Sequence, residues 1–517
     1  MEFTQCTIDK IHGKKVLVVS FCGTTPHLEV SLEICRRLCE KNIISYAHLG
    51  NYVSRPTMFS KTLIKRKIQL PLRINRARKY LEKYSTIKYP IQWISMTKIV
   101  RNMLDIYHQK SENFSFDTLE ELQQVEFDGY NIGIGVASTI ITEFGNPNPF
   151  PLSNNERKEV FEQLNSAIKS LIFAKLLLNL DNYDCVVLFN GRLSCEHAFK
   201  QVAMSKSVKL YYHERVKGNT RYFFEEYQPH FFNKRKKEMA LMNLELSKDI
   251  ISYIGEDFFK RKVLGEGIYE NSYLQNKLDY ISNDLSHALE SNMNKKIISY
   301  FTSSDDEYQS IDGFSSRYPY FKDQKSAVLE LSKVAKSLGH YLVVRVHPNL
   351  KSKHENEQRR WNEIGECIKN DGFYWISEKE SDSSYELVKQ SSLVITAGST
   401  IGVEAVYLNT PSIVITNSFF NDIVPSIKLV ESKEDLMAVL SDNSTSTSLD
   451  PSETYIYGAW IMNYGPEFKY FVPTHEFSVL YGLMKDGTRI ASPGISQRII
   501  EIIKYISGKR GAYHLTV

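Results

Sequence analysis

Short apolar runs rich in β-branched residues alternate with longer, helix-patterned segments along much of the chain. In the first half these runs predict strands at residues 15–21, 43–49, 131–141, 184–189 and 209–212. In the second half they predict strands at residues 296–301, 341–346, 373–376, 392–396 and 412–416. Apolar runs of this length are typical of strands that are buried on both faces of a parallel sheet.

Segments with helical spacing separate these strands. The clearest predicted helices lie at residues 28–39, 156–180, 195–204, 324–338, 385–390, 401–408 and 497–506. A strand, a turn, a helix and a further strand form a βαβ unit with a parallel sheet. Two such series, joined by a polar helical stretch with a linker near 284–295, predict an α/β protein with two parallel sheets. In it, two doubly wound Rossmann-like domains with helical insertions would face each other across a cleft.

The expected domain boundaries follow from this alternation. We expect an N-terminal Rossmann-like domain over residues 1–285, a C-terminal one over 286–490, and a final helix and tail over 491–517 that can pack back on the first domain. Residues 55–125 are expected to form a basic helical insertion. Its densest part, 55–80, leaves two interpretations open: a solvated helical face, or a surface that meets an anionic acceptor or the head groups of a membrane.

Composition narrows the class of protein. A length of 517 residues allows two to four domains at about 150 residues each. The hydrophobic share of 42% and the charged share of 24% exclude a mainly disordered chain. Sixty-four basic against 60 acidic residues leave a net charge of +4, so no general nucleic-acid binder is expected.

The chain also lacks targeting features. It contains no uncharged run of 18 apolar residues, no apolar signal segment at its N-terminus and no CxxC among its seven cysteines. We therefore expect a cytoplasmic protein, with peripheral contact to the inner face of the cytoplasmic membrane left open.

The most informative segment is LVITAGSTIGVEAVYL, in which a buried strand meets a helix through a turn of small residues. Free N–H groups at such a helix start attract a phosphate, and Ser399 and Thr400 would add hydroxyl donors. Gly398 would let the ligand approach, and Glu404 is placed to accept from sugar hydroxyls. The alternative is a capped helix whose glycines serve packing.

Two further strand ends of the second half carry polar residues. In VVRVHPNL, Arg345 and His347 would leave one side of the strand and suit a phosphate leaving group. In FTSSDDE, Ser303 and Ser304 could complete a phosphate pocket. The alternatives are a buried histidine with a surface arginine, and a turn that caps the following helix. The chain contains no DxD triplet, so a metal clamp on a nucleotide diphosphate is not expected.

Polar residues also follow the strands of the first half. The turn GTTPHLE offers His27 and Glu29. The turns after the later strands offer Asn190, Arg192, His213, Glu214 and Arg215. Each could equally be a polar residue that merely ends a strand.

The order SSDDE, RVHP and GSTIGVEA, with Pro411 downstream, resembles the C-terminal half of bacterial capsule-polysaccharide synthesis proteins. FNGR, HER and RYFFEEYQPH in the first half are similar to segments of relatives of that group. Related patterns occur in Kdo transferases of capsule assembly, polysialyltransferases and polyol-phosphate polymerases. The resemblance spans roughly residues 185–440, about half of the chain.

This resemblance implies a GT-B glycosyltransferase with its nucleotide-sugar donor on the C-terminal domain and its acceptor on the N-terminal one. It implies that His347 contacts the donor phosphate, that Ser399 and Thr400 bind it, and that Glu404 holds the ribose. It also implies metal-independent transfer without a cofactor. The HP pair favours a CMP-sugar of the Kdo type, with UDP- and GDP-sugars as alternatives, and the acceptor would be a glycan or a lipid-linked glycan.

An inverting transfer needs a base that takes the proton of the acceptor hydroxyl. His27 and Glu214 are the two candidates. The polar groups expected to bind or orient the acceptor are Glu29, Asn190, Arg192, His213 and Arg215. Three other functions stay open: a sugar-nucleotide 2-epimerase, a polyol-phosphate transferase, and a non-catalytic component of capsule assembly.

Overall fold

The computed structural model of the protein describes residues 7–24, 26–56, 70–85, 90–95, 114–216, 221–264, 279–309, 311, 318–442, 449–472 and 484–487. The predicted C-terminal helix at 497–506, the tail 491–517 and part of the basic stretch 55–80 lie outside these residues. Within the part that is described, no helix is both long and apolar enough to cross a bilayer.

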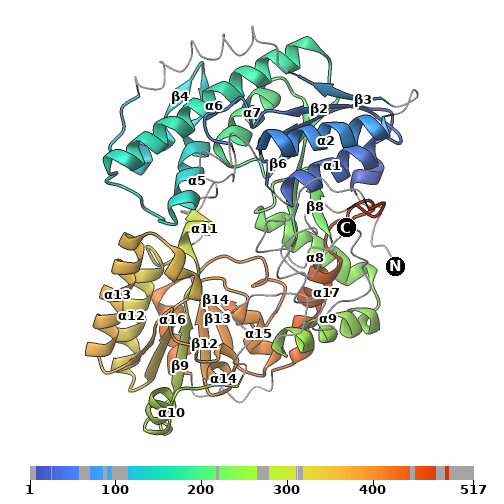
Figure 1. Cartoon of the computed structure of the whole chain (residues 1–517). Coiled ribbons are helices and arrows are strands. Elements are labelled where there is room, and N and C mark those ends of the chain that lie inside the picture. The colour runs from blue at the N-terminus through green and yellow to red at the C-terminus, as the bar shows by residue number, and fades with distance from the viewer. Residues whose placement is uncertain are drawn as a thin grey trace.

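The first half of the chain forms a six-stranded sheet (Figure 1). Its strands, in spatial order, are β3 (Ile91–Ile94), β2 (Ile43–His48), β1 (Lys15–Ser20), β6 (Cys185–Phe189), β7 (Lys209–Arg215) and β8 (Tyr222–Glu225). All neighbours pair in parallel except β7 and β8, which are antiparallel. The central strands are buried, as their continuous apolar runs predict.

The second half forms another six-stranded sheet, which is parallel throughout. Its strands, in spatial order, are β11 (Tyr374–Ile376), β10 (Tyr341–Arg345), β9 (Ile297–Phe301), β12 (Leu393–Thr396), β13 (Ser412–Val414) and β14 (Lys428–Leu429). The predicted architecture of two doubly wound domains is therefore confirmed.

Both sheets reverse their strand order beside the first strand of the domain. In the first sheet this switch point lies between β1 and β6, and in the second it lies between β9 and β12. Doubly wound sheets bind ligands beyond the carboxyl ends of the strands at such a point. The polar turns predicted from the sequence follow these four strands and their neighbours β7 and β10.

Helices cover both faces of each sheet (Figure 1). Those around the first sheet are α1 (His27–Leu38), α2 (Leu70–Tyr84), α4 (Leu119–Gln123), α5 (Gly133–Phe144), α6 (Asn154–Leu180) and α7 (Ser194–Ser205). Those around the second are α10 (Asn283–Glu290), α11 (Asp305–Gln309), α12 (Gln324–Ser337), α13 (Glu355–Asn370), α14 (Ser384–Lys389), α15 (Ile401–Tyr407) and α16 (Lys433–Ser441).

The strand predicted at 131–141 is wrong, because this segment forms α5. Its isoleucines, valine and threonines favour a strand, yet they are buried almost all round and so show no helical periodicity. Gly135 lets α5 approach α7, since a Cβ there would lie 2.6 Å from His197 Cβ. Gly145, with φ of +61°, ends the helix in the left-handed conformation, and this glycine was the available sign of a helix end.

Two other expectations also change. The linker predicted at 284–295 contains α10, because Leu285 and Leu289, one turn apart, are buried in the second core. The predicted basic insertion supplies α2 and the edge strand β3, so these parts belong to the first domain's layers. Tyr80 and Leu81 of α2 are buried against that sheet, which a helical face in solvent would not allow.

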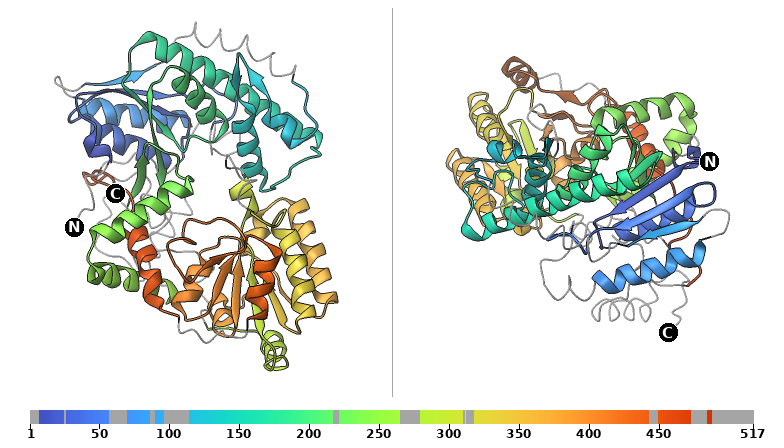
Figure 2. Two further views of the ribbon diagram at one scale, coloured as in Figure 1. Left: turned by 180° about the vertical axis from the view of Figure 1, so that it is seen from behind. Right: turned by 90° about the horizontal axis from the view of Figure 1, so that it is seen from above.

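Two segments of the chain connect the domains. The chain leaves the first domain through α8 (Phe232–Glu245) and α9 (Lys248–Val263) and comes back through α17 (Tyr455–Asn463). The helix α17 packs against both α8 and α9, as the rear view in Figure 2 shows. Residues 466–471 then return to the first domain, where Tyr222 N–H donates to the carbonyl oxygen of Pro466 at 3.0 Å. Described residues of both halves therefore share one hydrophobic core.

Candidate functional site

Polar side chains gather at the carboxyl ends of β1, β6 and β7. His27 begins α1 after β1, Asn190 follows β6, and Glu214 lies at the end of β7. These strands are parallel neighbours, so their ends meet at one edge. Asn190 and Gly191 have φ values of +52° and +85°, which turns the chain sharply beside β1.

The two candidate bases are neighbours. His27 Nδ1 and Glu214 Oε1 lie 3.3 Å apart, although their alignment is not that of a hydrogen bond. Asn190 Nδ2 donates to Glu214 Oε2 at 2.8 Å, and the N–H of Arg215 donates to Oε1 at 3.0 Å. A base that acts on the acceptor must be accessible to it, but His27 is 4% exposed, and its ring packs against Phe189 with centroids 4.4 Å apart.

Burial sets the protonation of this pair. Burial, with the charge of Arg215, lowers the pKa of His27 to about 3, so the imidazole is neutral. Burial raises the pKa of Glu214, while the hydrogen bond from Asn190 and the charges of Arg215 and Arg192 oppose that rise. The side chain of Glu214 remains 18% exposed, so of the two it is the group that a substrate can reach.

Three other predicted residues are engaged in contacts within the first domain or buried there. Arg192 donates to the hydroxyls of Ser138 and Thr142 on α5, at 2.8 and 3.1 Å. His213 is fully buried, and its Nε2 lies 3.2 Å from Ser31 Oγ, so it supports α1 from inside the sheet. Glu29 is 1% exposed. His213 and Glu29 therefore lie in the interior rather than with the exposed part of the Glu214 carboxylate.

The switch point of the second sheet brings the serine-rich turns together. Ser303 Oγ donates to the carbonyl oxygen of Ala397 at 3.2 Å, and Ser303 N–H donates to Gln324 Oε1 at 2.6 Å. Ser303 thus ties two strand ends together with its hydroxyl engaged. Ser304 is half-buried beside it.

The turn after β12 has the shape that its small residues predict. Gly398 has φ of +79°, a conformation that favours glycine, and Ser399 N–H donates to Thr396 Oγ1 at 3.1 Å. Ser399 and Thr400 are half-buried, and Thr400 directly precedes α15.

Arg345 is the most unusual side chain of this edge. It is 7% exposed, and among the described residues its Nε and one terminal nitrogen have no hydrogen-bond partner. Burial lowers the pKa of this guanidinium, while the charges of Asp382 and Glu380 oppose the shift. Buried polar groups are normally paired, so Arg345 is suited to bind an anion.

His347 lies two residues beyond Arg345, where it caps a short 3-10 helix. Its Nδ1 accepts the N–H of Asn349 at 3.1 Å, and its own N–H donates to Thr302 Oγ1 at 2.8 Å. Because Nδ1 accepts, the proton of the neutral ring lies on Nε2, which can donate to a phosphate oxygen.

Glu404 has partners that the sequence did not indicate. Lys262, on α9, forms an ion pair with Glu404 Oε1 and donates to Thr400 Oγ1 at 3.3 Å. Tyr385 OH donates to Glu404 Oε2 at 2.9 Å. Lys262 belongs to a run of basic residues in a polar helix, and no motif distinguishes it.

The helix α5 connects the two edges. It holds Arg192 of the first sheet, and it contacts α11, which begins at the end of β9 (Figure 1). The carbonyl oxygen of Gly145 accepts the N–H of His354 at 3.4 Å, and His354 Nε2 lies 3.2 Å from Glu156 Oε1. The carboxyl ends of the two sheets therefore lie on the sides of the domains that face each other.

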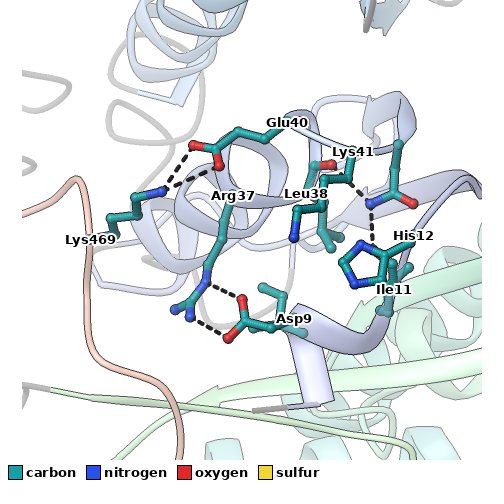
Figure 3. A pocket seen from close by; sticks show the side chains of 10 residues that line it. Asp9, Ile11, His12, Arg37, Leu38, Glu40, Lys41 and Lys469 are labelled. Carbon is teal, nitrogen blue, oxygen red and sulfur yellow. Dashed lines mark hydrogen bonds and ion pairs between the residues drawn. The ribbon is translucent and has the colours of Figure 1, made fainter. Parts of the chain in front are cut away.

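A cavity of about 250 Å³ lies elsewhere, before the amino ends of β1 and β2 (Figure 3). Among its lining charges, Arg37 pairs with Asp9 at 2.8 Å and Lys469 with Glu40 at 3.0 Å. Since these charges neutralise one another at the opposite edge of the sheet, we place this cavity outside the site.

No family model matches the sequence, and the search of curated proteins gave no match. Among solved structures, the KpsC β-Kdo 2,7 transferase of Thermosulfurimonas dismutans is 15% identical over 60% of this chain and 88% of that chain, with a TM-score of 0.30. The β-Kdo 2,4 transferase of the same organism's KpsC is 10% identical over 53% and 79%, with a TM-score of 0.33.

A putative UDP-N-acetylglucosamine 2-epimerase from Listeria monocytogenes is 11% identical over 87% of this chain and 95% of that chain, with a TM-score of 0.29. Kdo transferases and putative epimerases are thus both among the similar structures. Because each TM-score is below 0.5, these similarities assign no activity to the chain.

Proposed function

We propose that the protein is a metal-independent, inverting glycosyltransferase. It would move a sugar from a nucleotide-sugar donor to a growing bacterial surface glycan of the capsule or O-antigen type. One observation carries this proposal: the Glu214 carboxylate beside His27 lies on one sheet edge, and the buried, incompletely paired Arg345 lies on the edge that faces it. A proton acceptor opposite a phosphate-binding cation is what displacement at a sugar phosphate requires.

In this mechanism the acceptor hydroxyl oxygen attacks the anomeric carbon while Glu214 takes its proton. The bond between that carbon and the donor phosphate oxygen breaks, and the electron pair leaves with the nucleotide. Arg345 and the Nε2–H of His347 bind the phosphate as its negative charge grows. Because burial raises the pKa of Glu214, its carboxylate is a stronger base than an exposed one.

Donor and acceptor are proposed from the same residues. Glu404 would hold the donor ribose, and the half-buried Ser399 and Thr400 would lie against the phosphate. A CMP-sugar is favoured by the motif resemblance, with UDP- and GDP-sugars as alternatives. The charges of Arg192 and Arg215 beside Glu214 suit an acidic glycan or lipid-linked glycan as the acceptor.

Calorimetric binding of CMP, CDP, UDP and GDP to the full chain, followed by hydrolysis of the matching nucleotide sugars, tests this proposal. We expect one nucleotide to bind and its sugar to form a new glycosidic bond. An epimerase would convert the donor without an acceptor, and a polyol-phosphate transferase would leave phosphate in the product, visible by phosphorus NMR. Absence of binding by all four nucleotides would contradict the proposal and favour a non-catalytic assembly component.

Arg345→Met separates binding from folding. We expect nucleotide affinity to fall about 10- to 100-fold, because charge-assisted hydrogen bonds to phosphate are lost. The melting temperature should stay equal or rise, because a buried guanidinium without full pairing costs free energy. Arg359→Met, an exposed change on α13, is the control. Unchanged affinity in Arg345→Met would remove Arg345 from the donor site.

A further inference from the structure

Lys262 enters the second sheet's site from outside both sheets. It lies in the last turn of α9, 142 residues before its ion-pair partner Glu404. The side chains of Lys262 and Glu404 are only 11% and 5% exposed. Taking two charges out of water is costly, so a pair buried in this way calls for a reason other than stability.

The pair fixes both the charge and the orientation of Glu404. Burial alone would raise the pKa of Glu404, but the charge and hydrogen bond of Lys262, with the hydrogen bonds from Thr400 and Tyr385, together hold this pKa below its ordinary value. Tyr385, from α14, donates to the second carboxylate oxygen. Burial raises the pKa of Tyr385 well above its ordinary value, so its phenol stays neutral and remains a donor.

The carboxylate keeps accepting capacity after these contacts. Each carboxylate oxygen has two lone-pair sites, and Lys262 and Tyr385 use one site on different oxygens. The Thr400 hydroxyl also bonds this carboxylate, but a hydroxyl can rotate to another acceptor when a ligand arrives. A second pair of donors can therefore bind across both oxygens. The adjacent hydroxyls of a ribose supply two donors at a matching spacing, whereas a 2′-deoxyribose supplies one.

We propose that Lys262 is a positioning residue of the nucleotide site, which holds Glu404 as an oriented anion for the two ribose hydroxyls and so makes the protein prefer ribonucleotides to deoxyribonucleotides. This inference rests on the proposed function, because it takes Glu404 as the ribose-binding group. Lys262 acts through Glu404 and needs no contact with the substrate.

The test compares the binding of CMP and UDP with that of their 2′-deoxy forms by calorimetry. We expect the wild type to prefer the ribonucleotide by about tenfold or more, and Glu404→Gln to lose that preference. Lys262→Met should lose most of it at pH 6, and Lys262→Arg should retain it. Lys260→Met is the matched control, because Lys260 is exposed on the same helix and pairs with Glu256 at 2.7 Å.

The pH dependence separates positioning from mere packing. The groups that face Glu404 are Lys262, Tyr385 and the Thr400 hydroxyl. Without Lys262, burial raises the pKa of Glu404, so the ribose preference of Lys262→Met should grow as pH rises from 6 to 8. The preference of the wild type should stay constant. A packing defect would instead lower the affinity for ribonucleotides and deoxyribonucleotides equally at every pH.

Three results would overturn the inference. If Lys262→Met keeps the wild-type ribose preference at every pH, Lys262 has no positioning role, and the proposed donor site is not contradicted. If the wild type binds nucleotide without a preference for ribose, Glu404 does not bind the ribose hydroxyls, and Lys262 cannot act through it. A wild type that binds no nucleotide overturns both this inference and the proposed function. A double variant in which Lys262→Met adds nothing to Glu404→Gln supports action through Glu404.

Discussion

Burial decides which residue at the first sheet's edge can exchange a proton. His27 and His213 are 4% and 0% exposed, and burial lowers the pKa of each to about 3. Both rings therefore stay neutral at physiological pH. Glu214 differs because burial raises its pKa while part of its side chain remains exposed. In the proposed mechanism, a proton taken at this site is therefore held by Glu214, and His27 packs beside it as a neutral ring.

Replacing Glu214 by Gln tests the base directly. We expect kcat to fall about 10²- to 10⁴-fold with little change in KM, because the amide cannot take the acceptor proton. The wild-type rate should fall as pH drops through the raised pKa of Glu214, since only the carboxylate is active. This acidic limb should vanish in Glu214→Gln, as measured by kcat against pH.

Glu226→Gln is the control for that variant, because Glu226 is exposed and pairs with Lys209. It should keep both the rate and the acidic limb. A Glu214→Gln enzyme with wild-type kcat and an unchanged acidic limb would show that the base lies elsewhere.

The proximity of site residues could be predicted from the sequence where those residues follow neighbouring strands. His27 and Glu214 each follow a predicted strand, and parallel pairing through β6 brings them together. The burial of His27 was not predictable, because it depends on the Phe189 ring that packs against it. The pairing of Lys262 with Glu404 was also hidden, since it depends on how α9 packs on the second domain.

At the scale of elements, the buried parallel strands carried the clearest sequence signal. Their apolar runs predicted ten strands, and nine of those runs coincide with strands of the two sheets. The exception became α5, where burial on nearly all sides removes the periodicity that marks a helix. The edge strands β3, β8 and β14 escaped prediction because each has only two to four residues, and β3 and β14 are also only partly buried.

The crossing of α9 and α17 depends on two glycines that face each other. A Cβ at Gly255 would lie 2.2 Å from the carbonyl oxygen of Tyr455, and one at Gly458 would lie 3.1 Å from Gly255 Cα. Gly255 and Lys262 are seven residues apart, so they lie on nearly the same face of α9. The close crossing therefore also sets where the Lys262 side chain begins.

Gly255→Ala should force the two helices apart. We expect the protein to lose about 1–3 kcal/mol of unfolding free energy, because the added methyl meets rigid backbone. Nucleotide affinity should fall as well, because Lys262 moves with α9. Thermal unfolding and calorimetry measure the two effects. Tyr253→Ala, at a side chain that is 79% exposed on the same helix, should change neither. An unaltered melting temperature in Gly255→Ala would mean that the crossing tolerates separation.

At the scale of the whole molecule, a segment that follows the second domain packs back on the first domain. The predicted tail at 491–517 pointed to such a return, but residues 469–471 already make one. Glu33 of α1 is fully buried and accepts the N–H groups of Lys469, Tyr470 and Phe471 at 2.7, 2.9 and 3.1 Å. This contact could not be predicted, because a carboxylate within a helical pattern indicates a solvated face.

Glu33→Gln should loosen that return while leaving the second sheet intact. A carboxylate offers two accepting oxygens to the three N–H groups, whereas an amide offers one oxygen and turns an NH₂ group toward the remaining donors. At least one buried N–H then lacks a partner, which costs about 1–3 kcal/mol. Amide hydrogen exchange should quicken at residues 469–471, and β9 and β10 should keep their protection.

Glu40→Gln is the control, since Glu40 pairs with Lys469 at the surface and should change stability by less than about 0.5 kcal/mol. Equal exchange at 469–471 in Glu33→Gln and wild type would show that the return is held by the apolar contacts of Phe468 and Phe471 instead.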